Sequence, residues 1–316
     1  MKVLITGAAG FIGSHTAERL LSEGHEVIGV DNICNYYSTA LKRSNAMAVR
    51  EEGGVILELD LRDTATYEKL PKDVDYIIHF AAQPGISQTS SYEDYLSNNV
   101  QATKYLVDYA LGVPKLKMFI NIATSSIYGL EASYPETFAP RPASYYGVTK
   151  LAAEQLVLQK SREKQIKACS LRLYSVIGPR ERPEKLFTKL IALGLANKPF
   201  PLFEGSEKHL RSFTYVGDIV NGIYSAIGKE SVLDGEIINL GTDQEYTTQD
   251  GIDAVAEVLG KPIQLELKPR RAGDQWRTKA MIDKARELLD YNPKTTLKES
   301  VAHQVNWYKG QQHLEV

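Results

Sequence analysis

A tyrosine and a lysine stand four residues apart in the segment YGVTK, at Tyr146 and Lys150. Residues four apart share one face of a helix, so the phenol and the ammonium group are expected to lie side by side. A free tyrosine has a pKa of about 10 and is a poor base at neutral pH, but nearby positive charge favours the phenolate. The pair therefore predicts a general base that takes a proton from a substrate hydroxyl.

Three hydroxyl side chains precede this pair, at Thr124, Ser125 and Ser126 in the segment ATSSIYG. Thr124 ends an apolar run and is expected to hold the reacting hydroxyl of the substrate. The segment contains no carboxylate, and a serine hydroxyl cannot abstract a carbon-bound proton at neutral pH. It therefore lacks the base that removal of a proton from carbon requires.

A glycine-rich turn lies near the start of the chain, with Gly7, Gly10 and Gly13 in TGAAGFIGSH directly after the first apolar run. One glycine permits a tight turn, a second lets the backbone approach a pyrophosphate, and a third allows close helix–strand packing. The helix N-terminus that follows favours phosphate. Asp31 ends the second run, where it would bind ribose hydroxyls and repel a 2′-phosphate. Together these features predict an NAD site.

Further contacts with NAD are predicted after the third and fourth apolar runs. Asp60 and Leu61, in LDLRD, are placed to meet the adenine amino group and ring, and capping of the next helix is the alternative role for Asp60. The small Ala81 and Ala82, in HFAAQ, let the backbone pass close to the cofactor. His79 is expected in the core, and the histidines lack metal-ligand spacing, so no metal is predicted. The other predicted NAD contacts are Phe11, Ile12, Asn32, Gln83, Asn99, Tyr146 and Lys150.

These residues must be positioned by elements of the first half of the chain, where short apolar runs alternate with helix-period segments. The runs have the composition of strands that are buried on both faces. Such alternation is typical of an α/β protein with a doubly wound parallel sheet, a Rossmann-like fold. The expected strands are 2–6, 26–30, 55–59, 76–80, 118–122 and 168–173, and the expected helices lie near 12–23, 40–51, 92–111 and 146–164.

After Tyr174 the pattern changes to clustered prolines and longer loops. We interpret this change as a smaller, partly interleaved α/β domain that binds the substrate. The NAD-binding domain is expected over 1–174 plus about 213–243, because a run at 237–240 is expected to return to the main sheet. The substrate domain is expected over 175–212 and 244–316. Later helices are predicted near 216–228, 248–259, 281–289 and 297–309, and a strand at 262–267.

Composition limits the class of protein. The 316 residues carry a net charge of −2, which gives no electrostatic reason to expect nucleic acid or an anionic membrane as partner. No run approaches the roughly eighteen apolar residues of a membrane-spanning helix. The two cysteines, Cys34 and Cys169, fit a reducing compartment better than a disulfide framework, although a single disulfide is the alternative. We therefore expect a cytoplasmic protein.

The order of five motifs resembles the extended short-chain dehydrogenase/reductase family, which includes NAD-dependent nucleotide-sugar epimerases and dehydratases. The motifs are TGAAGFIGSH, HFAAQ, TSSIYG, YGVTK and RSFTYVGD, and the likeness covers essentially the whole chain. Dehydratases of this family carry Asp and Glu where this sequence has Ser125 and Ser126. The resemblance therefore implies a 4-epimerase, in which Tyr146 deprotonates the C4 hydroxyl of a UDP-sugar and the 4-ketone turns over before it is reduced.

The resemblance also implies how the UDP-sugar is bound. Arginines suit the diphosphate because a guanidinium donates two parallel hydrogen bonds to phosphate oxygens. The implied contacts are Arg211 and Arg271 with the diphosphate, Asp274 with the ribose, Leu202 and Phe203 of FPLF with uracil, and Ser125, Ser126, Ser175 and Arg182 with the sugar.

Two segments, DNICNYYSTALKRSNA and GPRERPEK, resemble family members that act on UDP-glucuronate. Arg182 matches an arginine that faces the sugar carboxylate there. Two departures weaken the match: Ser87 replaces an arginine, and SVIGP replaces NVYGP or TVYGP. Because of the two segments and Arg182, UDP-glucuronate is the predicted substrate. Because of the two departures, UDP-glucose/UDP-galactose or a UDP-N-acetylhexosamine are the alternatives. Asp31 argues against an NADPH-dependent reductase, and the tyrosine–lysine pair argues against a non-enzymatic scaffold.

A homodimer is expected, because members of the family commonly pair two long helices across a two-fold axis. The helices at 92–111 and 146–164 would form this four-helix bundle. Leu151, Leu156 and Val157 are predicted to lie either on that surface or on the core side of their helix.

Overall fold

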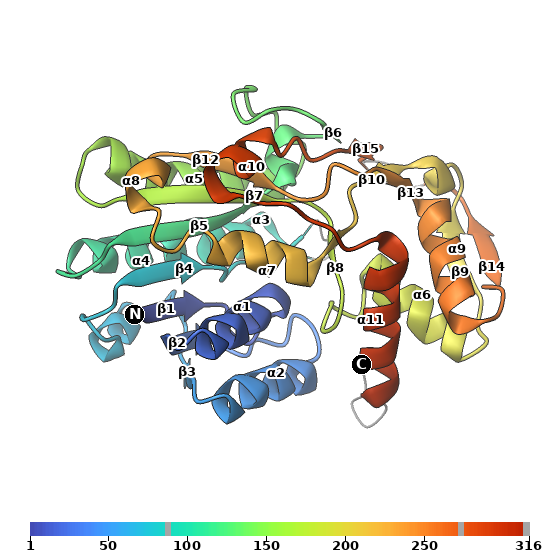
Figure 1. Ribbon diagram of the computed structural model, residues 1–316, viewed down its shortest axis with the longest axis horizontal. Helices are drawn as coiled ribbons and strands as arrows, with labels where there is room; N and C mark the ends of the chain where they lie inside the picture. The colour runs from blue at the N-terminus through green and yellow to red at the C-terminus, as the bar shows by residue number, and fades with distance from the viewer. Residues whose placement is uncertain (86–89, 271–274, 312–316) are drawn as a thin grey trace.

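The main feature of the molecule is a seven-stranded parallel sheet (Figure 1). The computed structural model describes residues 1–85, 90–270 and 275–311. The strand order is β12-β7-β5-β4-β1-β2-β3, and every neighbouring pair is parallel. The α/β, Rossmann-like prediction is confirmed, including the return of 237–240 to this sheet. The strands are β1 Lys2–Thr6, β2 Glu26–Asp31, β3 Val55–Glu58, β4 Tyr76–His79, β5 Met118–Thr124, β7 Ala168–Leu173 and β12 Ile237–Leu240.

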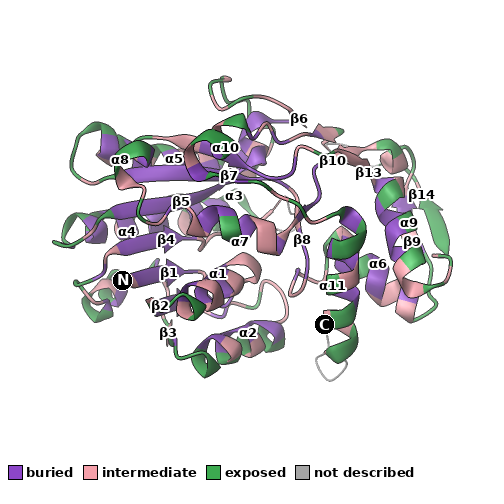
Figure 2. Cartoon of the chain, in the orientation of Figure 1, coloured by how far each residue is buried: buried purple, intermediate pink, exposed green. Residues whose placement is uncertain are grey.

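Helices cover both faces of this sheet. Helices α1 (Phe11–Ser22), α2 (Thr39–Glu51) and α7 (Val216–Tyr224) cover one face, which is the near side in Figure 1. Helices α4 (Ala102–Leu111) and α5 (Tyr145–Arg162) cover the other. A short helix α3 (Tyr92–Tyr95) and a π-helical turn η2 (Leu96–Gln101) lead directly into α4. The strands are therefore buried on both sides, as Figure 2 shows.

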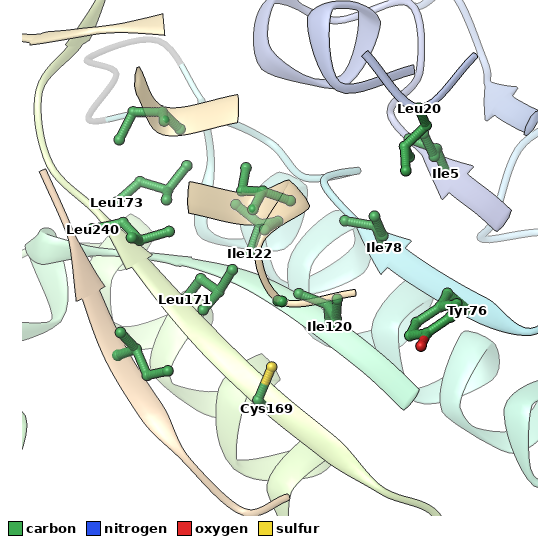
Figure 3. Close-up of a cluster of buried hydrophobic side chains, with 14 of the residues drawn as sticks. Ile5, Leu20, Tyr76, Ile78, Ile120, Ile122, Cys169, Leu171, Leu173 and Leu240 are labelled. Carbon is green, nitrogen blue, oxygen red and sulfur yellow. The ribbon is translucent and has the colours of Figure 1, made fainter. Parts of the chain in front are cut away.

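Alternate residues of the central strands form two separate apolar layers. Figure 3 shows Ile120 and Ile122 of β5 next to Leu171 and Leu173 of β7, all on the face that α1 covers. Their neighbour Phe119 belongs to the opposite cluster, with α4 and α5. This arrangement follows from the two-residue period of a strand. It leaves the polar residues at the strand ends free to line a site.

A smaller region packs around its own apolar cluster. Helices α6 (Leu186–Leu195), α9 (Thr248–Leu259) and α11 (Leu297–Gly310) form it, together with strand β9 (Phe200–Phe203). Strand β14 (Leu265–Lys268) pairs with β9 at the far edge in Figure 1. The chain enters this region after β7, returns for α7, α8 (Glu230–Leu233) and β12, and then enters it again.

Short strands connect the two parts of the molecule. Two-residue strands form a four-stranded sheet in the order β13-β10-β15-β6, and β11 pairs with β8. These strands are β6 Glu131–Ala132, β8 Val176–Ile177, β10 Leu210–Arg211, β11 Thr214–Tyr215, β13 Tyr246–Thr247 and β15 Arg277–Thr278. The remaining elements are η1 Thr64–Lys69, η3 Ser125–Tyr128, η4 Ser206–Lys208 and α10 Asp283–Leu289.

Several polar groups are buried in the main core. The ring of His79 lies between the hydroxyls of Thr6 and Thr103, at 2.7 and 2.8 Å, and burial lowers its pKa to about 3. The histidine is therefore neutral, and its predicted core position is confirmed. Cys34 and Cys169 are both free.

Two searches of the described part of the chain bear on membranes and metals. Over residues 1–85, 90–270 and 275–311, no helix has the length and apolar character needed to cross a bilayer. The same residues contain no group of three His, Cys, Asp or Glu side chains that could bind a metal ion.

Candidate active site

A cavity of about 710 Å³ opens at the carboxyl ends of the central strands, where ligands bind in open α/β sheets. Most of the residues singled out from the sequence line it. They are Gly7, Gly10, Phe11, Ile12, Gly13, Asp31, Asn32, Asp60, Leu61, Ala81, Ala82, Gln83, Thr124, Ser125, Ser126, Tyr146, Lys150, Ser175, Arg182 and Arg211.

The glycine loop forms one end of this cavity. Gly10 precedes the first residue of α1 and has no side chain with which to cap the helix, so the N–H groups of the first turn face the cavity without a capping side chain. A Cβ atom at Gly13 would lie 2.2 Å from the carbonyl oxygen of Gly7, so only glycine fits there. This backbone cradle at a helix N-terminus fits the pyrophosphate of a dinucleotide.

Two carboxylates lie beside the glycine loop. The Asp31 carboxylate accepts hydrogen bonds from the backbone N–H groups of Ala9, at 3.1 Å, and Ile33, at 2.9 Å, and it remains part of the cavity wall. Asp60 accepts hydrogen bonds from the Arg62 guanidinium, at 2.6 Å, which lowers the pKa of Asp60 to about 2. It does not cap the next helix, because Asp63 caps η1. The helix-capping alternative for Asp60 is therefore wrong.

Asn99 lies behind the cavity wall rather than in it. Its side-chain oxygen accepts a hydrogen bond of 2.7 Å from the backbone N–H of Gln83, and its amide group donates to the Thr149 hydroxyl at 3.0 Å. The π-helical turn η2 brings Asn99 into this buried position. Asn99 therefore contacts the cavity through Gln83, and its predicted contact with NAD stays a prediction.

The tyrosine, lysine and threonine predicted for catalysis all line the cavity. Ser144 caps the start of α5 and sets Tyr146 and Lys150 in its first turns. Gly147 allows this helix to approach closely, because a Cβ atom there would lie 2.6 Å from the carbonyl oxygen of Ser126. The Thr124 side chain, at the end of β5, hydrogen-bonds the phenol of Tyr146. Thr124 and Tyr146 are therefore in direct contact, and Lys150 lines the same cavity.

Burial acts on the protonation of both Tyr146 and Lys150. Burial raises the pKa of Tyr146, and the hydrogen bond from Thr124 and the positive charge of Arg182 oppose this effect. The ammonium group of Lys150 instead donates to the carbonyl of Ile122 at 2.7 Å. The predicted lowering of the phenol pKa by Lys150 together with the positive nicotinamide of bound NAD stays a prediction. Burial also lowers the pKa of Lys150 to about 8.

A cluster of cations surrounds the other end of the cavity. The Arg182 guanidinium lies 5.6 Å from the centre of the Tyr36 ring, donates to the carbonyl of Pro84 at 3.4 Å and pairs with Glu184 at 2.8 Å. Arg211, on β10, donates to the carbonyls of Leu210 and Gln275. This end of the cavity therefore presents positive charge suited to an anionic ligand.

Among the predicted substrate contacts that the structure describes, Leu202 and Phe203 do not line the cavity. Arg271 and Asp274 lie outside the described residues, as does Ser87. Leu202 is buried in the apolar cluster of the smaller region, and the neighbouring Phe203 is half-buried. The proposed contacts of Leu202 and Phe203 with uracil therefore rest on the resemblance alone.

Sequence reasoning missed several residues of the cavity wall. The ammonium group of Lys42 is almost fully buried, donates to the carbonyl of Cys34 at 2.8 Å and lies 4.4 Å from the centre of the Tyr37 ring. Only the segment DNICNYYSTALK, noted for its resemblance, pointed to this region. Other lining residues that were missed are Tyr36, Glu181, Lys185 and Gln275.

The parallel sheet, the glycine cradle and the tyrosine–lysine pair define a Rossmann-type protein with a dinucleotide-shaped cavity. The family follows from comparison with known proteins. The chain belongs to the NAD dependent epimerase/dehydratase family, whose model matches residues 3–241. It is therefore an enzyme of the isomerase class that uses NAD, and the predictions of family, enzyme class and cofactor are confirmed.

The relatives of this chain are named for different sugars. The chain is 34% identical over 309 residues to an uncharacterised UDP-glucose epimerase of Bacillus subtilis, covering 96% of this chain and 97% of the relative. It is 29% identical over 333 residues to a probable UDP-glucuronate 4-epimerase of Rhizobium meliloti, covering 98% and 97%.

The similar solved structures also include enzymes named for UDP-glucuronic acid and for UDP-glucose. UDP-glucuronic acid 4-epimerase of Bacillus cereus, in complex with UDP-glucuronic acid and NAD, matches with a TM-score of 0.92 and 33% identity over 98% of this chain and all of the other. UDP-glucose 4-epimerase of Thermus thermophilus, in complex with NAD, matches with a TM-score of 0.86 and 30% identity, covering 98% and 99%.

Proposed function

We propose that this enzyme interconverts UDP-glucuronate and UDP-galacturonate by inverting C4. One observation carries the proposal: Arg182 and the hydroxyls of Thr124, Ser125 and Ser126 line the same cavity as Tyr146, with no carboxylate at positions 125 and 126. A guanidinium beside hydroxyl donors suits a sugar carboxylate. The absence of acids at 125 and 126 disfavours dehydration.

Side chains of this protein bind the C4 hydroxyl and transfer its proton. Thr124 holds the C4 hydroxyl, and the Tyr146 phenolate takes its proton as the carbon is oxidised. NAD, when bound, supplies the acceptor and donor of the two electrons at C4. Its proposed contacts are the glycine loop, Asp31, Asp60, Leu61 and Lys150. After the 4-ketone turns over about its diphosphate link, its opposite face is presented for reduction at C4, and Tyr146 returns the proton to the C4 oxygen. C4 is therefore inverted with no net oxidation.

A carboxylated substrate brings a side reaction that the site must suppress. Oxidation at C4 creates a β-keto acid. If the C5–C6 bond aligns with the ketone, it breaks, CO₂ leaves, its electron pair forms an enolate, and C5 then takes a proton. Hydrogen bonds from Ser125, Ser126 and Arg182 hold the carboxylate out of this alignment. The same contacts therefore bind the substrate and protect the intermediate.

The rest of the UDP-sugar is proposed to extend toward the smaller region. Arg211 contacts the diphosphate and Ser175 the sugar, and both line the cavity. Lys185, at the start of α6, adds a further positive charge there. We propose that 1–174 with about 213–243 binds NAD, and that 175–212 and 244–316 bind the UDP-sugar.

The test is to incubate the enzyme separately with UDP-glucuronate, UDP-glucose and UDP-N-acetylglucosamine and to identify the C4 epimers formed. Epimerisation of UDP-glucuronate at the highest kcat/KM is the expected result. Arg182→Ala should lose most of this activity, and full retention would overturn the role of Arg182. Preferential turnover of a neutral sugar would overturn the proposed substrate.

A neutral UDP-hexose is the second candidate. Ser87 stands where enzymes for UDP-glucuronate usually have an arginine. This chain therefore has one positively charged residue fewer among those expected to bind the sugar carboxylate. UDP-glucose/UDP-galactose and UDP-N-acetylhexosamines are the alternatives that this change favours.

We further propose a homodimer formed through the face of α3, η2 and α5. Tyr92, Leu96, Tyr145 and Val148 are large apolar side chains that are exposed on these helices. Val157 belongs to the core instead. A cytoplasmic location is also proposed, and the two free cysteines support it.

A further inference from the structure

The segment 178–185 joins β8 to α6, and three successive charged side chains in it point to three different parts of the molecule. Arg180 contacts α1, Glu181 contacts α6 and α11, and Arg182 lines the cavity. Neither Arg180 nor its ionic partner Glu18 lines the cavity. Their contact therefore needs an explanation other than ligand binding.

Arg180 binds the helix that carries the glycine loop. Its guanidinium pairs with the Glu18 carboxylate at 2.8 Å and donates to the Ser14 hydroxyl at 3.1 Å. The side chains of Arg180 and Glu18 are only 15% and 24% exposed, so water screens the pair less than an ordinary surface pair. Arg180 also has a φ of +70°, a left-handed conformation that is unfavourable for a residue with a Cβ atom. The contact therefore holds the backbone in a specific, strained shape.

A second contact from α1 supports the same segment. The Nε2 atom of His15 lies 3.0 Å from the carbonyl oxygen of Pro179, and it must be the donor because a carbonyl only accepts. Burial and the charge of Arg180 lower the pKa of His15 to about 4. The ring is therefore neutral over the working range of pH and keeps this hydrogen bond.

The other side of the segment is fixed in the smaller region. The buried Glu181 carboxylate accepts hydrogen bonds from the Thr188 hydroxyl at 3.2 Å and from the Gln304 amide at 2.9 Å. Arg182 directly follows these two anchored residues in the sequence. Arg180 and Glu181 therefore fix the backbone from which the Arg182 side chain reaches the cavity.

We propose that the Arg180–Glu18 ion pair is a positioning contact that aims Arg182 at the carboxylate of the sugar. It links the glycine-loop helix to the substrate side of the cavity without touching either ligand. This inference rests on the proposed function, because it assigns the pair a role in binding a carboxylated sugar.

The test is Glu18→Gln, which keeps the size of the side chain and removes its charge. The KM for UDP-glucuronate should rise about tenfold, since small misplacement of a positioned group is costly. The decarboxylated 4-ketopentose should form a larger share of the product, while bound NAD per subunit stays unchanged. Glu23→Gln is the matched control, because Glu23 forms an exposed pair with Arg19 on the same helix.

The charge swap Glu18→Arg with Arg180→Glu re-forms the ion pair, so it should return the KM and the product ratio toward their wild-type values. A merely structural role would not change the share of decarboxylated product while bound NAD stays constant. Arg180→Gln should reproduce the effect of Glu18→Gln from the other side. Wild-type values in both single variants, or no recovery in the swap, would overturn the positioning role alone. A wild-type enzyme that epimerises only neutral UDP-sugars would overturn the proposed function and this inference with it.

Discussion

Lys150 on α5 donates a hydrogen bond of 2.7 Å to the backbone carbonyl of Ile122 on β5. This contact fixes the ammonium group beneath the cavity, one helical turn from Tyr146. Its burial lowers the pKa of Lys150 to about 8, whereas that of a solvated lysine is about 10.4. The residue that is expected to favour the phenolate therefore titrates close to the working pH.

The first prediction is an alkaline loss of kcat/KM. Lys150 is charged below its pKa and neutral above it, so kcat/KM should fall as the pH rises through about 8. In Lys150→Arg the guanidinium stays charged, and this alkaline limb should disappear even if the overall rate is lower. The measurement is a pH profile of kcat/KM for both enzymes. An identical limb in the two profiles would assign it to another group.

The second prediction concerns the phenol itself. Tyr146→Phe should lower kcat by about 10²–10⁴-fold, the usual contribution of a general base, without loss of bound NAD. The matched control is Tyr145→Phe, because the adjacent Tyr145 is 59% exposed and does not line the cavity. Steady-state kinetics and the NAD content of the purified variants are the measurements. Epimerisation at the wild-type rate in Tyr146→Phe would contradict the mechanism.

The third prediction concerns stability. Glu154 on α5 and Arg172 on β7 form an ion pair at 2.6 Å, with side chains 0% and 1% exposed. Removing one partner leaves a buried charge alone, so Glu154→Gln should lower the free energy of unfolding by about 3–5 kcal/mol. Urea unfolding measures this change, and Glu163→Gln, at an exposed pair on the same chain segment, should leave the midpoint unchanged. The double variant Glu154→Met with Arg172→Met should recover much of the loss.

The fourth prediction concerns assembly. Val148 is 43% exposed on the face proposed for the dimer, so Val148→Glu should convert a dimer to a monomer. Val55→Glu is the control. Val55 is similarly exposed, but it lies on β3, an edge strand of the main sheet, and not on the face proposed for the dimer. Light scattering after size exclusion measures the mass of each variant. A wild type that is already monomeric would refute the proposed homodimer.

The main sheet could be predicted because its strands are short, mostly apolar runs with clear breaks between them. The bounds of helix α6 could not be predicted from the sequence. LFTKLIALGL is apolar around most of the helix circumference, so it lacks the contrast between an apolar and a polar face that marks a helix. The two-residue strands that carry Arg211 and Arg277 are too short to leave a pattern.

The candidate site was predictable where motifs end a strand or begin a helix, as at Gly7, Asp31, Thr124 and Tyr146. Lys42 was missed because one lysine in an exposed-looking helix gives no sign of burial. Its ammonium group reaches the cavity only through the fold of the preceding loop. Leu202 shows the opposite case, in which a motif resemblance points to a residue that lies in an apolar core.

The position of β12 in the sheet has a consequence for biosynthesis. Strand β7 pairs with β5 on one side, but its other edge is covered only by β12, which begins 64 residues after β7 ends. During translation this edge stays open while the whole intervening segment leaves the ribosome. An open strand edge can pair with another chain. A premature stop between residues 174 and 236 would therefore release a chain with this edge open and prone to aggregation.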